Sequence, residues 1–241
     1  MTPLSPSRQL ALNLKLRDAS SFENLITGRN REAVERLRRA VRELAQARQS
    51  PASWLYLWGE SGCGKTHLLE AACRAAQAIG ITSIYIPLAD KNMLSPALLE
   101  DVEQTALVCV DDVARIAGDT AWEAALFALY ERVRAQGGML IVAASAGPMV
   151  LGLKLPDLAT RLAAGLVYPL QPLSDDEKIA ALRLRAERRG MEMGEDVARY
   201  LLTRYPRDLH SLFALLDRLD VATLAAQRRL TIPFLRDLEE R

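Results

Sequence analysis

The sequence predicts an α/β domain, with a parallel sheet flanked by helices, followed by a small all-α domain. Apolar runs typical of buried strands alternate with helical patterns up to about residue 172, and this alternation indicates a parallel sheet covered on both faces. From residue 173 onward the pattern is almost purely helical. We therefore predict three segments: a flexible extension over 1–21, the α/β domain over 22–172 and the helical domain over 173–241.

Individual elements follow from hydrophobic spacing and from the residues that begin and end helices. The expected strands cover 54–58, 83–86, 106–110 and 139–144, with a short fifth strand over 167–170 at the edge of the sheet. Asn30 is expected to cap a helix over about 31–44, and further helices are expected over 68–79, 96–103, 122–133 and 155–162. In the C-terminal domain the expected helices cover 175–189, 195–204, 207–228 and 233–239, the first opened by a capping box of Ser174 and Glu177.

Residues 59–66, Gly-Glu-Ser-Gly-Cys-Gly-Lys-Thr, fit the phosphate-binding pattern G-x-x-x-x-G-K-[ST], the P-loop. An expected buried strand precedes them and an expected helix follows, so that backbone N–H groups and the positive end of the helix converge on phosphate oxygens. Lys65 is expected to neutralise the β- and γ-phosphates, and the Thr66 hydroxyl to bind Mg²⁺. A glycine turn with an exposed lysine is the alternative, but it leaves both flanks unexplained. The predicted nucleotide-contacting residues are Gly59, Glu60, Ser61, Gly62, Cys63, Gly64, Lys65, Thr66 and the adjoining His67.

Two acids end the third expected strand. Because the carboxyl ends of parallel strands face the ligand crevice, Asp111 is expected to hold Mg²⁺, directly or through water. Asp112 is expected to orient or polarise the attacking water, which makes it a candidate catalytic residue. The alternative is an acidic helix start, because acids favour helix N-termini. Ser145 follows the fourth strand at the same edge and is either a contact to the γ-phosphate or a turn residue.

Two arginines are candidates for contacts with nucleotide. Arg161 projects from the short helix over 155–162. It suits an arginine finger that neutralises transition-state charge on a nucleotide held by a neighbouring subunit, and a surface salt bridge is the alternative. Arg207 begins a helix, and an arginine there opposes the helix dipole unless an anion such as a bound nucleotide lies nearby.

Composition limits the class of protein. The chain of 241 residues carries 31 basic and 30 acidic residues, so its net charge of +1 gives no strong field toward DNA or an anionic membrane. No direct sequence-specific DNA binding is expected. Three cysteines indicate no disulfide framework, two histidines indicate no metal site, and no apolar run approaches the ~20 residues of a membrane span. We expect a cytoplasmic protein.

Residues 9–14, Gln-Leu-Ala-Leu-Asn-Leu, alternate their leucines at period two. The pattern alone favours an edge strand. No hairpin signal accompanies it, however, so a short linear peptide that docks its leucines in a partner's pockets is the alternative.

Together these motifs resemble an AAA+ domain, in which a helical lid follows the P-loop domain. The stretches Phe22–Asn30, Asp111-Asp112 and Leu170–Asp175 are similar to the bacterial replication initiator DnaA and its relatives. The stretches Leu155–Leu162 and Arg228–Phe234 are closer to the Hda-type regulatory inactivators of DnaA. The resemblance covers essentially all of residues 9–239.

The resemblance implies roles for individual residues. The peptide that binds the DNA polymerase III sliding clamp in that family matches Gln9, Leu10, Leu12 and Leu14. Positions that line the adenine pocket match Leu25 and Ile26, while the arginine finger matches Arg161 and the sensor-2 arginine of the lid matches Arg207. Ser145 stands at the sensor-1 position, where the family usually carries Asn or Asp, so its reach toward a γ-phosphate is shorter.

The implied function is that of a negative regulator of replication initiation, bound to ADP or ATP with Mg²⁺. Tethered to the DNA-loaded clamp, it would stimulate hydrolysis of the ATP bound to DnaA, with at most weak ATPase activity of its own. DnaA and the clamp are the implied partners, and the oligomeric state, a homo-oligomer included, stays open. Two alternatives remain: a stand-alone AAA+ ATPase such as a helicase loader, and a clamp-binding adaptor in which nucleotide only stabilises the fold.

Overall fold

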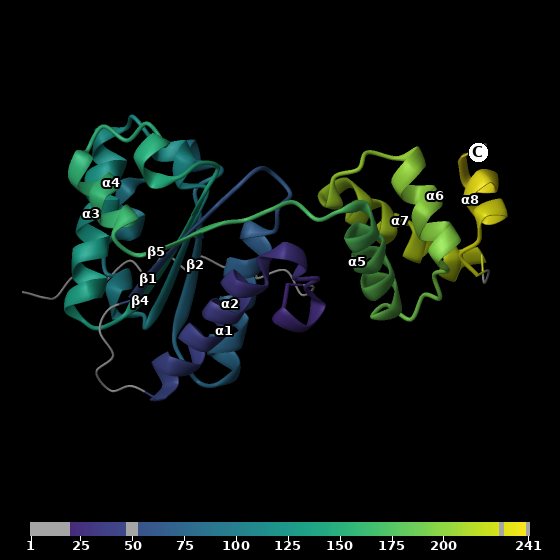
Figure 1. The fold of residues 1–241 in the computed structure, drawn as a ribbon, viewed down its shortest axis with the longest axis horizontal. Helices are drawn as coiled ribbons and strands as arrows, with labels where there is room; N and C mark the ends of the chain where they lie inside the picture. The colour runs from purple at the N-terminus through teal and green to yellow at the C-terminus, as the bar shows by residue number, and fades with distance from the viewer. Residues whose placement is uncertain (1–19, 47–52, 227–228, 240–241) are drawn as a thin grey trace, which may run out of the picture.

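The computed structural model describes residues 20–46, 53–226 and 229–239 (Figure 1). Within them, five strands form one sheet in the order β2-β3-β4-β1-β5. The strands are β1 (Ser53–Trp58), β2 (Ser83–Pro87), β3 (Leu107–Asp111), β4 (Met139–Ala144) and β5 (Leu166–Pro169). Every pair of neighbours is parallel, so the carboxyl ends of all five strands meet at one edge. The fifth strand lies at the border of the sheet, as the sequence predicts.

Four helices cover the sheet, two on each face (Figure 1). Side chains alternate along each strand, so that Leu55 and Leu57 of β1 join one core cluster while Tyr56 joins the other. The first cluster contains α1 (Arg31–Gln46) and α2 (Lys65–Ala78), and the second contains α3 (Thr120–Ala135) and α4 (Pro156–Ala163). Burial on both faces explains why the strands are almost continuously apolar.

The predicted helix over 96–103 is wrong. The chain there forms two 3-10 turns, Pro96–Leu99 and Val102–Gln104. Asp101 separates the turns in a left-handed conformation, φ 61°, which no α-helix contains.

Asn30 does not cap α1, and that prediction is also wrong. Its side-chain amide donates to the Gln171 carbonyl and accepts the Gln171 N–H, both at 2.8 Å. The amide that was expected to satisfy the helix start therefore forms a tertiary pair. This pair ties the beginning of α1 to the segment that leads out of β5.

After β5 an extended segment leads to four helices with a core of their own (Figure 1). They are α5 (Asp175–Glu187), α6 (Glu195–Arg204), α7 (Leu209–Ala226) and α8 (Ile232–Glu239). The capping box of Ser174 and Glu177 opens α5 as predicted. The helix α7 begins two residues later than expected, because Asp208 Oδ1 accepts the Ser211 N–H at 2.8 Å and so acts as its cap.

The helical lid meets the α/β domain at α5. This helix lies against the turn Phe22–Asn24, and a Cβ on Gly28 would stand only 2.8 Å from Glu177 Oε1. The change from strands to helices falls between Pro169 and Asp175, close to the predicted boundary, and the three segment boundaries stay a prediction. None of the helices in the described ranges is long and apolar enough to cross a membrane.

Candidate functional site

The P-loop connects β1 to α2 at the carboxyl edge of the sheet. Gly62 and Gly64 have φ values of 80° and 99°, which favour glycine, and a Cβ added at either would meet nothing within 4 Å. These two glycines therefore allow the left-handed backbone conformation of the loop, and because they have no side chain they leave open space in front of it. Since Gly64 is also the N-cap of α2, this space lies at the positive end of a helix.

Lys65 is held inside the loop. Its side chain is almost buried, and its ammonium donates to the carbonyls of Gly59 at 2.7 Å and Glu60 at 2.9 Å. Cys63 Sγ lies 3.7 Å from the same Nζ. The carbonyl dipoles of the loop therefore hold the positive charge of Lys65 in position, where it suits a phosphate group.

Asp111, the last residue of β3, gathers three donors. Its Oδ2 accepts the hydroxyls of Thr66 at 2.6 Å and Tyr85 at 3.0 Å, and its Oδ1 accepts the Asp112 N–H at 2.9 Å. Burial, followed by the neighbouring Asp111, raises the pKa of Tyr85, so its hydroxyl stays protonated and donates. The carboxylate is 1% exposed and fixed in orientation.

Asp112 occupies a strained position beside it. Its φ of 57° is left-handed, a conformation that Asp tolerates better than most residues. Burial, and then repulsion from Asp111, raise the pKa of Asp112, while Lys65 and Arg115 act in the opposite direction. A carboxylate with a raised pKa beside a phosphate-binding lysine is suited to hold or accept a proton from water.

The residues present fit a nucleotide with Mg²⁺. The loop leaves open space at Gly62 and Gly64, at the N-terminus of α2, and the oxygens of Thr66 and Asp111 stand next to each other at its end. Hydroxyl and carboxylate oxygens are the ligands that Mg²⁺ takes when phosphates supply the rest. Metal binding would replace the hydrogen bond between Thr66 and Asp111 by shared coordination.

The residues expected at the adenine lie next to the lid. Leu25 and Ile26 are half-buried and follow the turn that α5 contacts. His67, half-buried on α2, lies with Nε2 2.9 Å from the Ser21 carbonyl, and burial is the main reason why the pKa of His67 is lowered. Nearby Arg185 of α5 lowers that pKa further, which places the lid close to this side of the P-loop.

Two further predicted residues lie apart from this cluster. Ser145 is exposed in the bend after β4, at the same edge as Asp111. Arg207 belongs to the lid, where its guanidinium pairs with Asp175 Oδ2 at 3.4 Å and is largely exposed. The structure thus brings the P-loop, Asp111, Asp112 and Ser145 to one edge of the sheet. It places Arg207 beside Asp175, the first residue of α5.

Arg161 lies in the last turn of α4, whose Leu158 and Leu162 are buried in the core. Its guanidinium pairs with Glu131 of α3, with Nε 3.4 Å from Oε1, and its side chain is 46% exposed. The clamp-peptide residues Gln9, Leu10, Leu12 and Leu14 lie outside the described residues.

Sequence reasoning missed two residues. Tyr85 reaches Asp111 from the neighbouring strand, and no local pattern distinguishes it from an ordinary strand tyrosine. Glu123 is fully buried in α3 and accepts three backbone N–H groups, from Gly118, Lys154 and Leu155. A signal for Glu123 existed, since it stands three residues before Leu126 on the core-facing stripe of the helix.

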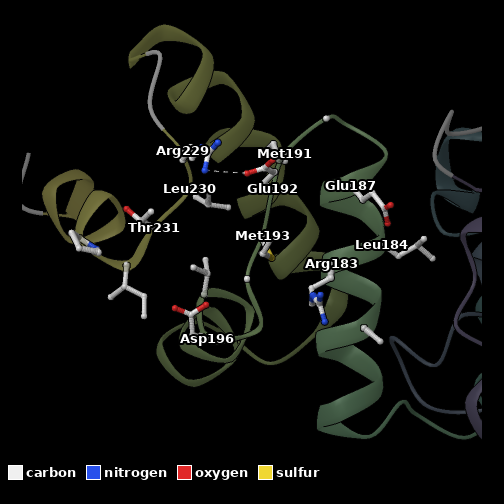
Figure 2. A pocket seen from close by; sticks show the side chains of 16 residues that line it. Arg183, Leu184, Glu187, Met191, Glu192, Met193, Asp196, Arg229, Leu230 and Thr231 are labelled. Atoms are coloured by element: carbon white, nitrogen blue, oxygen red, sulfur yellow. Dashed lines mark ion pairs between the residues drawn. The ribbon is translucent and has the colours of Figure 1, made fainter.

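A cavity of about 1000 Å³ lies within the lid and not at the P-loop (Figure 2). Met191, Met193 and Leu230 contribute apolar surface, and Arg183, Glu187 and Asp196 contribute charges. No described residue of the predicted nucleotide site lines it. A P-loop binds phosphate with backbone groups at an open edge, so its geometry suits a nucleotide phosphate better than this cavity does.

Comparison with known proteins agrees with this geometry. A family model described as the bacterial DnaA ATPase domain matches residues 16–169, and one described as the lid domain of Hda matches residues 175–238.

Several solved structures are similar in fold. Domain III of the replication initiation protein DnaA from Thermotoga maritima has a TM-score of 0.73 at 21% identity, over 92% of this chain and 98% of that one. AMPPCP-bound DnaA from Aquifex aeolicus has a TM-score of 0.66 at 24% identity, over 84% of this chain and 66% of that one. A RuvB variant from Thermotoga maritima has a TM-score of 0.67 at 16% identity, over 92% of this chain and 71% of that one. At these identities the structures establish the AAA+ fold.

The two family matches cover most of the α/β domain and most of the lid. The chain therefore belongs to the family of the bacterial DnaA ATPase domain, and it is an Hda-type, DnaA-related AAA+ protein among the regulators of DNA replication.

Proposed function

We propose that this protein is a nucleotide-bound negative regulator of replication initiation that stimulates hydrolysis of ATP bound to DnaA. The observation that carries the proposal is the location of Arg161, in the last turn of α4 and away from the chain's own P-loop, with its side chain 46% exposed. The family match makes a DnaA-related initiator the natural partner. Acting on chromosomal replication, the protein would work in the cytoplasm.

The path of α4 supports action on a second molecule. The helix begins beyond the carboxyl end of β4 and leads to the amino end of β5, a rise of about 12 Å for eight residues. Arg161 lies in its last turn, so it has moved away from the edge that carries Lys65 and Asp111. A guanidinium there serves a nucleotide bound by a neighbour better than one bound by its own chain.

The surroundings of α4 suit a protein partner. The turn Pro148–Val150 lies against α4 and exposes Met149 and Val150 to 69% and 76%. Methionine and arginine side chains are enriched in protein–protein interfaces, and α4 links this turn to Arg161. We propose that this surface contacts the DnaA molecule whose ATP is hydrolysed.

The chain's own nucleotide, ADP or ATP with Mg²⁺, has a supporting role in this proposal. Bound Mg²⁺ would neutralise phosphate charge. Lys65 binds the phosphates, Thr66 and Asp111 hold the metal, and Arg207 fixes the lid angle once the lid approaches the nucleotide. Leu25 and Ile26 enclose the base. Intrinsic hydrolysis is weak at most, because Ser145 is short and exposed at its bend.

Tethering to the DNA-loaded sliding clamp completes the proposal. Gln9, Leu10, Leu12 and Leu14 would dock on the clamp. A tether raises the effective concentration of the finger near DNA-bound DnaA, so a weak contact between the two proteins suffices. Neither direct sequence-specific DNA binding nor a membrane contact is required, and the protein acts as a monomer or as a homo-oligomer.

One observation favours a second candidate function, a stand-alone ATPase such as a helicase loader. Asp112 has a raised pKa next to Lys65, as a group that activates water requires. This alternative predicts turnover by the purified protein alone, lost in Asp112→Ala and independent of the clamp.

Hydrolysis of DnaA-bound ATP, measured with and without DNA-loaded clamp, tests the proposal. Removing an arginine finger costs ~10³–10⁵-fold in other phosphoryl-transfer systems, so Arg161→Ala should nearly abolish stimulation. Gln9→Ala should lower stimulation only when the clamp is present.

Arg134→Ala is the matched control. Arg134 approaches the same Glu131 at 4.0 Å and its side chain is 50% exposed, close to the exposure of Arg161. The control should stimulate like the wild type. Full stimulation by Arg161→Ala would overturn the proposal, and the same turnover without DnaA would favour the stand-alone ATPase.

A further inference from the structure

Glu123 is a charged side chain in the hydrophobic core, with no exposed surface. It lies in the first turn of α3, where the positive end of the helix favours a carboxylate. Its Oε1 accepts the N–H groups of Gly118 at 2.6 Å and Lys154 at 3.1 Å, and its Oε2 accepts that of Leu155 at 2.7 Å. These bonds offset the cost of burying a charge.

The three donors belong to two segments of the chain. Gly118 lies in the connection from β3 to α3, a short distance after Asp112. Lys154 and Leu155 directly precede α4, with Leu155 at its N-cap. Leucine has no side-chain oxygen to cap a helix, so Glu123 supplies from α3 the acceptor that the entry into α4 lacks locally.

The helix α4 needs such an anchor. It has eight residues, and helices of that length are marginal on their own. Leu158 and Leu162, buried on one face, fix its rotation about its axis. Glu123 fixes the two residues that precede α4, Lys154 and Leu155, to α3 and to the connection that leaves Asp112. Both sets of contacts together determine where Arg161 stands.

We infer that Glu123 is a positioning residue for Arg161, acting by holding the start of α4. This inference rests on the proposed function, in which Arg161 enters the nucleotide site of a partner. Glu123 itself touches neither nucleotide nor partner in that scheme. A displacement of ~1 Å in a catalytic group can cost ~10²-fold in rate, so a small shift of α4 is enough to matter.

Glu123→Gln is the sharpest variant because it conserves size. The amide keeps one oxygen, which can still accept from Gly118 and Lys154. Its NH₂ group then faces the Leu155 N–H, and two donors oppose each other. In the flipped orientation the amide NH₂ opposes Gly118 and Lys154 instead. Either orientation leaves at least one N–H at the entry to α4 without an acceptor.

Val133→Ala is the matched control, since Val133 lies on α3 and packs in the core cluster that also contains Leu158 and Leu162 of α4. It destabilises α3 without changing the bonds to α4. We would measure melting temperature, affinity for ADP, the maximal stimulated rate of DnaA-bound ATP hydrolysis and the concentration giving half of that rate. Glu123→Gln should lower the maximal rate at least tenfold compared with Val133→Ala, with the half-maximal concentration and ADP affinity within about threefold of it.

The double variant Glu123→Gln/Arg161→Ala tests whether Glu123 acts through Arg161, with both variants compared by the residual single-turnover hydrolysis of DnaA-bound ATP above the rate of DnaA alone. If it does, the double variant stimulates no less than Arg161→Ala alone. A further loss in the double variant would overturn the inference. The inference would also be overturned if Glu123→Gln reached the same maximal stimulated rate as Val133→Ala while Arg161→Ala was inactive. In that case the proposed function would stand.

If Arg161→Ala proves fully active, amide hydrogen exchange tests the anchoring of α4 by Glu123 separately from the proposed function. The proposed function would then be overturned, and exchange over residues 156–163 would test the anchor alone. Exchange at least tenfold faster in Glu123→Gln than in Val133→Ala would support the anchoring of α4, and equal exchange would overturn it.

Discussion

The P-loop edge and the Arg161 surface lie at opposite ends of the sheet and hold their charged groups in different ways. Lys65 is 9% exposed and Asp111 is 1% exposed, and each makes several hydrogen bonds. Arg161 is 46% exposed and makes one ion pair with Glu131. The first arrangement preorganises a site for a ligand. The second leaves a cation free to exchange one partner for another, as a group acting on a neighbour must do.

The largest effect should come from the preorganised edge. Lys65→Ala removes the only lysine of the P-loop, and charge-assisted contacts of about 1.5–3 kcal/mol each are lost. With 1.4 kcal/mol per factor of ten, affinity for ADP should fall about 100-fold in a fluorescence titration.

Lys91→Ala, which removes an ion pair with Asp119, should leave that affinity unchanged. An affinity of Lys65→Ala within threefold of the wild type would mean that nucleotide does not bind at the P-loop. Lower thermal stability with full stimulation of DnaA would instead support a clamp adaptor in which nucleotide only stabilises the fold.

A smaller effect should come from Asp112. Its pKa is higher in the folded protein than the ordinary 3.8, so the folded state binds the proton more tightly. The stability contribution of this carboxyl is therefore greatest at acidic pH and declines as pH rises through 3.8 and then through the folded value. Asp112→Asn removes the charge and keeps a residue that tolerates the left-handed conformation. It should raise the free energy of unfolding at pH 7, and raise it by less at pH 4.

Asp119→Asn provides a control of opposite sign. The hydrogen bond from Lys91 is the main reason why the pKa of Asp119 is lowered. Its stabilising contribution is present above 3.8 and disappears as pH falls through the folded value, so this variant should lose stability at pH 7 and little at pH 3. Urea unfolding between pH 3 and pH 7 measures the free energy of unfolding of both variants. If Asp112→Asn were less stable than the wild type at pH 7, burial of the Asp112 carboxylate would not be unfavourable.

The smallest effect should come from Glu131→Gln. Exposed ion pairs contribute about 0–1 kcal/mol, so the free energy of unfolding should change by less than about 0.5 kcal/mol. Stimulation of DnaA should stay within about threefold of the wild type, because Arg161 remains on a fixed helix. A tenfold loss would show that Glu131 orders the finger, and the contrast between the two ends of the sheet would then weaken.

Most of the sheet and the P-loop edge could be predicted from local signals. Uninterrupted apolar runs mark strands buried on both faces, and the glycine spacing before Lys65 marks the loop. Asp111 and Asp112 could be assigned to the same edge because parallel strands end together. The helix predicted over 96–103 failed because Asp101 adopts a left-handed conformation that spacing does not reveal.

The sequence by itself determined the succession of strands and helices along the chain, and it determined the phosphate loop and the two acids after the third strand. These features depend on residues that are close together in the chain. Only the tertiary structure decided that Asn30 pairs with Gln171, that Glu123 holds the entry into α4, and that Arg161 lies away from its own P-loop. Each of these depends on contacts between residues far apart in sequence, and such contacts exist only once the sheet and its two helical layers have packed.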